Sequence, residues 1–269
     1  MHRSLLTSMI DRFARFQNEC ADLFVETATH LQPREEKLVA ICADQFNFIA
    51  NRSNAIIELL KIEALWDAQI LVRPLLESCV KICFLCFQPK ADRAVACHEY
   101  EEVLGIINRL KLHDKASKSI SGTYTEAHPT LNTLVLSEAE LSELRAKVPK
   151  DMRKEVESRW GFTRMMVELD QRFKADFQIT PFTSFAHTYG LSSHLIHADE
   201  MGLGAMRARA QLKGSQLSNI EQSHHVALLD AVAGSAMVSA MALSRAAEFN
   251  FEKASVLPEA FRRVHDDSY

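Results

Sequence analysis

Glycine and proline are scarce in this sequence, which has 8 glycines and 7 prolines among 269 residues. Both interrupt regular secondary structure, whereas the alanine, leucine, glutamate, lysine and arginine that fill the long stretches between them are good helix formers. Hydrophobic residues make up 47% of the chain, which is enough to bury a sizeable core. We therefore expect an all-α protein, a helical bundle of about seven to eight helices.

The sequence also lacks the patterns of several functional classes. It has no glycine-rich loop that would cradle phosphates and no dinucleotide-binding fingerprint, so no cofactor is expected. Its net charge is −4 with 25% charged residues, which argues against broad, non-specific binding of nucleic acid. The net charge does not exclude a local basic groove that binds nucleic acid.

Long hydrophobic runs are missing at the N-terminus. The apolar residues within positions 1–12 are too few and too interrupted for a signal peptide. We therefore expect a cytoplasmic protein whose six cysteines are free thiols in a reducing compartment. The best candidate for a membrane span is Val226–Leu243, but Asp230 interrupts it, so we expect a buried helix and no membrane contact.

Apolar residues at helical spacing divide the chain into segments. The expected helices cover residues 4–30, 33–62, 64–87, 91–114, 163–177, 184–199 and 218–249. A capping box at Ser137-Glu138-Ala139-Glu140 begins a further short helix. Residues 115–137 have little periodicity and are expected to form a loop excursion, and residues 202–214 are punctuated by glycine. We expect a single helical domain over residues 1–250 and a peripheral C-terminal tail over residues 251–269.

A first polar cluster, Arg73-Pro74-Leu75-Leu76-Glu77, interrupts an otherwise apolar helix. Arginine and glutamate are almost never buried without partners, and a spacing of four residues puts Arg73 and Glu77 on one helix face. Arginine before glutamate is the poorer order for an intrahelical ion pair, so we expect both side chains to bond to neighbouring helices. The cluster is either a buried clamp that sets helix register or a functional polar pocket.

A second polar cluster lies far downstream, where Tyr189, Ser193 and His197 recur at four-residue steps and His194 lies one turn from His197. One interpretation is that His197 acts as a general acid or base, since the usual pKa of histidine lies near neutrality. The other is a core histidine that bonds to Glu77 or Tyr189 on a facing helix. No third group is placed to orient a Ser–His pair, so a serine hydrolase is not expected.

Two histidine motifs invite comparison with metal sites, His194-x-x-His197 and Glu221-x-x-His224. A di-iron bundle needs two Glu-x-x-His motifs and two further glutamates, and this sequence has only one such motif. Three cysteines share one helical face, where we expect small core residues rather than zinc ligands: Cys79, Cys83 and Cys86. We therefore expect no metal site.

The segments 55–60 and 68–77, with Trp160-Gly161 and the segment 189–197 downstream, resemble domain-of-unknown-function family 5677. That family is bacterial and helical, with an arginine–glutamate helix, a Trp-Gly segment and a Tyr-Ser-His helix in this order. The resemblance covers about residues 50–199 and departs from the family after His197. It implies that the residues of the two clusters come together, with Trp160 nearby: Arg73, Glu77, Ser193 and His197.

A helical bundle with a polar arginine and histidine also resembles, more distantly, the nucleotide-binding helical superfamily of prokaryotes and higher eukaryotes. Many of its members are metal-independent ribonucleases of toxin–antitoxin and phage-defence systems, with an Arg-x4-6-His motif on one helix. The nearest match here, Arg109 to His113, is one residue too short. An analogous site would therefore have to combine Arg73 and His197 from two helices.

Two functions stay open. The first is a metal-independent ribonuclease-like effector acting on RNA or a nucleotide, with His197 as general acid or base, Arg73 on the phosphate, Glu77 orienting one of them and Ser193 assisting. Further substrate contacts are expected from Tyr189, His194, Trp160, Arg207, Arg209 and Lys213. The second is a non-enzymatic interaction or small-ligand-binding module in which the same residues form a structural polar clamp. Either function is compatible with a homodimer or a partner protein.

Overall fold

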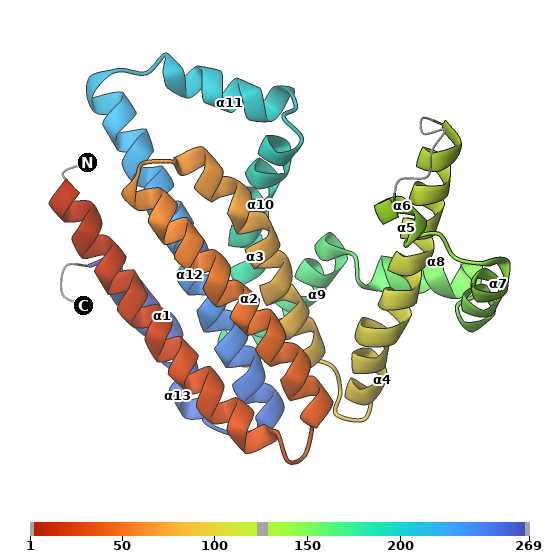
Figure 1. The fold of residues 1–269 in the computed structure, drawn as a ribbon. Coiled ribbons are helices and arrows are strands. Elements are labelled where there is room, and N and C mark those ends of the chain that lie inside the picture. Colours follow the sequence, from red (N-terminus) through yellow and green to blue (C-terminus); the bar gives the residue numbers. More distant parts are fainter. Residues whose placement is uncertain (1–2, 123–128, 267–269) are drawn as a thin grey trace. The chain divides into compact units, whose positions relative to one another are not determined.

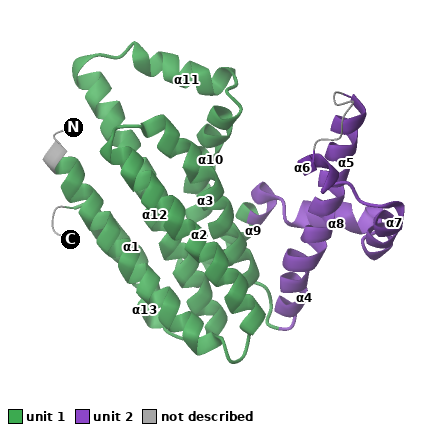
Figure 2. Cartoon of the chain, viewed as in Figure 1, with its two compact units in different colours: residues 1–90, 166–269 green, residues 91–165 purple. Residues whose placement is uncertain are grey.

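The computed structural model describes residues 3–122 and 129–266, and every regular element in these ranges is helical (Figure 1). The all-α fold expected from the composition is confirmed. The chain divides into two compact units, residues 1–90 with 166–269 and residues 91–165 (Figure 2). This is a finer division than the single domain expected over residues 1–250.

The first unit holds the long helices. Its elements are α1 (Arg3–Leu31), α2 (Glu36–Lys61), α3 (Leu65–Cys86), α9 (Phe162–Phe177), α10 (Pro181–Ile196), α11 (Glu200–Ala210), α12 (Gly214–Ala247), α13 (Phe251–Ser255) and α14 (Leu257–Val264). Helix α9 begins within the range of the second unit and ends in the first. The predicted break near residues 62–64 is confirmed, and α3 continues through Pro74.

Helix α12 is the centre of the first unit, because it packs against α1, α2, α3 and α10 (Figure 1). From Leu228 to Ala247 it is buried almost throughout, and most of these side chains are small. Small side chains let neighbouring helices approach closely, and the hydroxyls of Ser235 and Ser239 are satisfied by the carbonyls of Ala231 and Ser235. Of the described helices, α12 alone is long and apolar enough to cross a membrane. Its most apolar window is 83% buried inside the protein, as in a core helix.

The second unit is built from shorter elements. They are α4 (Arg93–His98), the π-helix η1 (Glu99–Val103), α5 (Leu104–Gly122), α6 (Pro129–Asn132), α7 (Glu138–Lys147) and α8 (Lys150–Arg159). Leucines from α5, α7 and the preceding turn form its core: Leu110, Leu136, Leu141 and Leu144. The predicted capping box of α7 is confirmed, since the Ser137 side chain accepts from the Glu140 amide and Glu140 accepts from the Ser137 amide.

The described residues contain more helices than the seven to eight expected, because several of the helices are short. The prediction of a loop over residues 115–137 was wrong in part. Helix α5 continues to Gly122 and buries Ala116 within this range, and α6 covers Pro129–Asn132. Residues 123–128 lie outside the described residues. The tail is also helical, and its α13 and α14 bury Ala254, Leu257 and Val264.

Two boundaries near α10 differ from the prediction for identifiable reasons. Helix α10 starts at Pro181 rather than Ser184, because a proline in the first turn lacks an amide that would have no intrahelical partner anyway. The glycine-punctuated segment is the helix α11, whose first amides donate to the Asp199 side chain. Gly202 is needed there because a Cβ at this position would lie 2.7 Å from the carbonyl oxygen of His194.

Candidate functional site

One face of α3 carries a row of polar and aromatic side chains, Trp66, Gln69, Arg73 and Glu77, spaced three or four residues apart. This face meets α10, which packs on α3 and α12. Two groups of interactions lie along it. The first, here called the Arg73 cluster, consists of Arg73, Glu77, Tyr189 and Ser193.

The Arg73 cluster links α3 to α10. Arg73 donates from Nε to the Glu77 carboxylate at 3.1 Å and from Nη1 to the Ser193 hydroxyl at 3.0 Å. Tyr189 donates its hydroxyl to the same Glu77 oxygen at 3.1 Å, and the Arg73 guanidinium lies 5.1 Å from the centre of the Tyr189 ring. The Arg73 and Glu77 side chains remain 26% and 32% exposed, so the cluster is shielded but not sealed.

The electrostatics of the cluster hold it in one protonation state. Burial by itself lowers the pKa of Arg73, but its hydrogen bond to Glu77 and its interactions with Tyr189 and the Glu77 charge together more than offset this and raise the pKa overall. The pKa of Tyr189 is raised, first by burial and then by the neighbouring Glu77 carboxylate. Near neutral pH the cluster therefore contains a charged arginine and a neutral tyrosine, and neither exchanges a proton readily.

The second group, here called the Gln69 network, links three helices through one buried amide. Gln69 is 1% exposed, and its Nε2 donates to the Thr188 carbonyl at 3.0 Å and to the Ser192 hydroxyl at 2.7 Å. Its Oε1 lies 3.0 Å from Nε2 of His224 on α12. Ser192 in turn donates to the main-chain carbonyls of Gln69 and Thr188. Gln69 thus joins α3 to α10 and to α12 at once.

His224 is held neutral within this network. Because Gln69 presents its oxygen, Nε2 of His224 carries the proton, and Nδ1 accepts from Nη1 of Arg209 at 3.3 Å. Burial and the Arg209 charge lower the pKa of His224 to about 4. Arg209 also donates to Glu221 at 2.9 Å and stacks over Trp66, with 5.3 Å to the ring centre.

The predicted clusters are brought together in part. The expectation that Arg73 bonds across helices is confirmed by its contact with Ser193 on α10. The expectation that sequence order would disfavour the Arg73–Glu77 pair was wrong, since these side chains do bond within α3. Tyr189 donates to the same Glu77 carboxylate, so a single acceptor organises the cluster.

The histidines do not join the Arg73 cluster. His197 caps the C-terminus of α10 with an exposed side chain, and no hydrogen bond from its ring is found among the described residues. His194 lies on α10 but pairs through Nδ1 with Asp199 at 2.7 Å. This bond and the amides of Met201 and Gly202 lower the pKa of Asp199, so His194 supports the start of α11.

The remaining predicted substrate contacts are engaged elsewhere. Arg207 pairs with Glu200 on the surface of α11, and Arg209 belongs to the Gln69 network with a side chain only 15% exposed. Lys213 precedes α12 and is exposed. Trp160 belongs to the second unit, where its indole donates to Glu99 at 3.1 Å.

Gln69 was missed in the sequence analysis, although it lies four residues before Arg73 at a buried position of the same helix. His224 was considered only as a metal ligand. Its neighbour Glu221 pairs with Arg209, and no group of three His, Cys, Asp or Glu side chains that could hold a metal ion occurs in the part of the chain that the structure describes. Cys79, Cys83 and Cys86 are fully buried core residues, as predicted.

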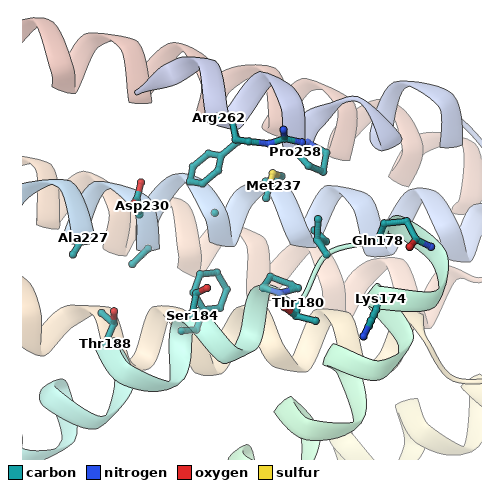
Figure 3. A pocket seen from close by; sticks show the side chains of 16 residues that line it. Lys174, Gln178, Thr180, Ser184, Thr188, Ala227, Asp230, Met237, Pro258 and Arg262 are labelled. Carbon is teal, nitrogen blue, oxygen red and sulfur yellow. The ribbon is translucent and has the colours of Figure 1, made fainter. Parts of the chain in front are cut away.

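A cavity of about 640 Å³ adjoins these interactions (Figure 3). It lies between the C-terminal part of α9, α10, α12 and α14, all in the first unit. Most of the exposed wall area is apolar, and the polar or charged residues that line the cavity are Lys174, Gln178, Thr180, Ser184, Thr188, Asp230 and Arg262. Thr188 lines the cavity with its side chain, and its carbonyl accepts from Gln69, so the cavity wall is continuous with the Gln69 network.

Comparison with known proteins yields one family. The family of unknown function DUF5677 matches residues 40–209, more than half of the chain. The matched range includes the Arg73 cluster and the α10 side of the Gln69 network, whereas His224 and Asp230 on α12 follow it. No curated protein and no solved structure matches the chain.

Proposed function

This chain belongs to the family DUF5677, and we propose that it is a non-enzymatic module that binds a small molecule between α10, α12 and α14. The observation that carries the proposal is the cavity of about 640 Å³, which has the size and the combination of mostly apolar wall area with polar groups that is typical of small-molecule sites.

The two polar groups support this proposal as structural clamps. Gln69 on α3 bonds to both α10 and α12. Helices α10 and α12 form the long walls of the cavity. With 3.6 residues per turn, Ser184 and Thr188 lie on the face of α10 next to the one that carries Tyr189 and Ser193. The bonds of Tyr189 and Ser193 therefore hold the cavity-lining face of α10 in position, which lowers the entropy cost of ligand binding.

The ribonuclease-like alternative, acting in a toxin or phage-defence system, needs Arg73 and His197 around one phosphate. Arg73 already bonds to Glu77 and Ser193, and the exposed His197 ring bonds to none of them. His224 belongs to the Gln69 network, but both of its ring nitrogens are engaged and its pKa is about 4, which does not suit proton transfer near neutral pH. The binding module is therefore the better-supported function.

A pair of matched variants tests the proposal. Ser184 lines the cavity from an exposed position on α10, whereas Ala186, two residues later, is exposed and does not line it. We expect octan-1-ol, a neutral apolar probe, to bind the wild-type protein and Ala186→Trp in calorimetric titrations. Ser184→Trp should fill the cavity and weaken this binding at least tenfold.

Equal binding of octan-1-ol to both tryptophan variants would reject the cavity as the site, and so would failure of both octan-1-ol and its amine analogue octylamine to bind. The ribonuclease alternative has a separate readout, RNA degradation or growth arrest on expression. Loss of that activity in both Arg73→Ala and His197→Ala would replace the binding module with the enzyme. We expect no such activity in the wild-type protein.

A further inference from the structure

We propose that the natural ligand of this cavity is an elongated molecule with an apolar body and a single cationic group, an ammonium or amidinium, which pairs with Asp230. This inference rests on the proposed function, because it names the chemical class that the same cavity selects.

Asp230 lies at one end of the cavity, as Figure 3 shows. On α12 it is close to Ala227, and Thr188 faces it from α10, while Lys174 and Gln178 lie at the opposite end. Between these ends the walls are mostly apolar, with Phe185, Phe261 and Met237 among their residues, although Thr180, Ser184 and Arg262 also line this part. The cavity therefore has one acidic end, an apolar middle and one basic end.

The Asp230 side chain is 37% exposed, and one of its two carboxylate oxygens lacks a hydrogen bond within the described residues. Its Oδ1 is buried and has no hydrogen-bond partner, although Nε2 of His265 lies 3.1 Å away. That distance fits an ion pair, but a histidine is charged only when protonated, and the contact does not meet hydrogen-bond geometry. A partly buried carboxylate without a lasting cationic partner is costly, and a ligand cation would relieve that cost.

The opposite end limits the ligand to one cation. Lys174 is exposed there, and no ion pair involving it is found among the described residues. Arg262 of α14 also lines the cavity, but it pairs with Glu259 at 2.8 Å. Lys174 would repel a second positive group on the ligand, but it would not repel a neutral or acidic end.

The length of the cavity sets the length of the ligand body. The residues of α10 that line it run from Pro181 to Thr188, which at 1.5 Å per residue spans about 10 Å. Gly234 forms part of the opposite wall on α12, where even a Cβ would lie 3.3 Å from the Phe185 ring. An unbranched chain of about eight carbons fits this length.

Three matched probes test the inference on the full chain: octylamine, octan-1-ol and 1,8-diaminooctane. In calorimetric titrations at pH 7.5 we expect octylamine to bind the wild-type protein at least tenfold more tightly than octan-1-ol. The diamine should bind more weakly than octylamine because of Lys174. Asp230→Asn should reduce octylamine affinity to that of the alcohol and leave the alcohol unchanged, and Asp11→Asn, at an exposed position on α1, is the control.

A pH series supplies a readout that needs no variant. Burial raises the pKa of Asp230 to about 6, and His265, whose charge opposes this, is the titratable group that faces it from the end of α14. Arg262 and Lys174 are the other charged groups that line the cavity. Octylamine affinity should fall about tenfold between pH 7.5 and pH 5 as Asp230 gains a proton, while octan-1-ol affinity stays constant.

The outcomes separate the two proposals. Binding of octan-1-ol with no preference for octylamine keeps the cavity as a ligand site and overturns the cationic ligand. Unchanged octylamine affinity in Asp230→Asn, or at pH 5, also overturns it. If neither probe binds, the proposed function fails as well.

Discussion

The sharpest test of the architecture is Gln69→Leu. Leucine has a similar volume, so the change removes the amide without leaving a large cavity. It deletes the bonds to the Thr188 carbonyl, the Ser192 hydroxyl and Nε2 of His224, which measure 3.0, 2.7 and 3.0 Å. Thr188 and Ser192 keep their bond to each other, so the main group left without a partner is Nε2–H of His224.

The expected cost follows from these contacts. An orphaned buried donor costs about 1–3 kcal/mol, and each further neutral hydrogen bond contributes about 1 kcal/mol. We therefore expect Gln69→Leu to lower the free energy of unfolding by about 3 kcal/mol. Adding His224→Phe removes the orphaned donor, so the double variant should lose clearly less than the sum of the two single changes.

The assay uses the two tryptophans of the chain, one in each unit. In a Trp160→Phe background, Trp66 alone reports urea unfolding of the first unit, and its ring lies 5.2 Å from the His224 ring. Gln222→Leu, at an exposed position of α12, is the control. A midpoint for Gln69→Leu within error of that control, or strict additivity with His224→Phe, would refute the three-helix clamp.

Three further predictions concern stability. Arg73→Lys should lower the free energy of unfolding by about 1–2 kcal/mol in urea titrations, because lysine cannot bond to Glu77 and Ser193 and stack on Tyr189 together; a change equal to that of an exposed Arg→Lys control would contradict this. The folded pKa of His224 is about 4, below its usual 6.5, so its neutral form contributes stability that is complete above pH 6.5 and is lost as the pH falls towards 4. That loss should reach about 2–3 kcal/mol and disappear in His224→Gln, and an unchanged pH slope in this variant would exclude His224 as its source. Gly202→Ala should lower the melting temperature through the close approach to the His194 carbonyl, whereas Gly204→Ala, whose nearest neighbour is the end of Arg207 at 3.9 Å, should not; equal effects would count against the close approach.

Most helices were predictable because helix formation depends on local spacing of apolar residues. The break between α2 and α3 and the capping box at Ser137 follow from residues within one or two turns of each other. Helix α11 was not predictable in this way, because glycine normally argues against a helix. Glycine is required at position 202 because its Cα lies close to the backbone of His194 on α10, where a Cβ would clash.

The candidate site divides along the same line. Arg73 and Glu77 stood out because a charged pair in an apolar helix needs partners, and Tyr189 and Ser193 followed from their four-residue spacing. The sequence does not indicate that Gln69 bonds to other helices, because a single amide in an apolar helix carries no charge. The position of His197 was misjudged because spacing along α10 does not reveal that the helix ends at Ile196, with this side chain exposed.

The sequence by itself determined the helical class, the core positions of Cys79, Cys83 and Cys86, and the need of Arg73 for a partner across helices. These properties depend on composition, periodicity and the cost of burying a charge, which are all local. Only the tertiary structure decided that α12 brings His224 to Gln69 and Asp230 to the end of a cavity. Both depend on the packing and rotation of α12 against other helices, α3 for His224 and α10 with α14 for Asp230. The nearly uniform stretch of small apolar residues in α12 does not specify that rotation.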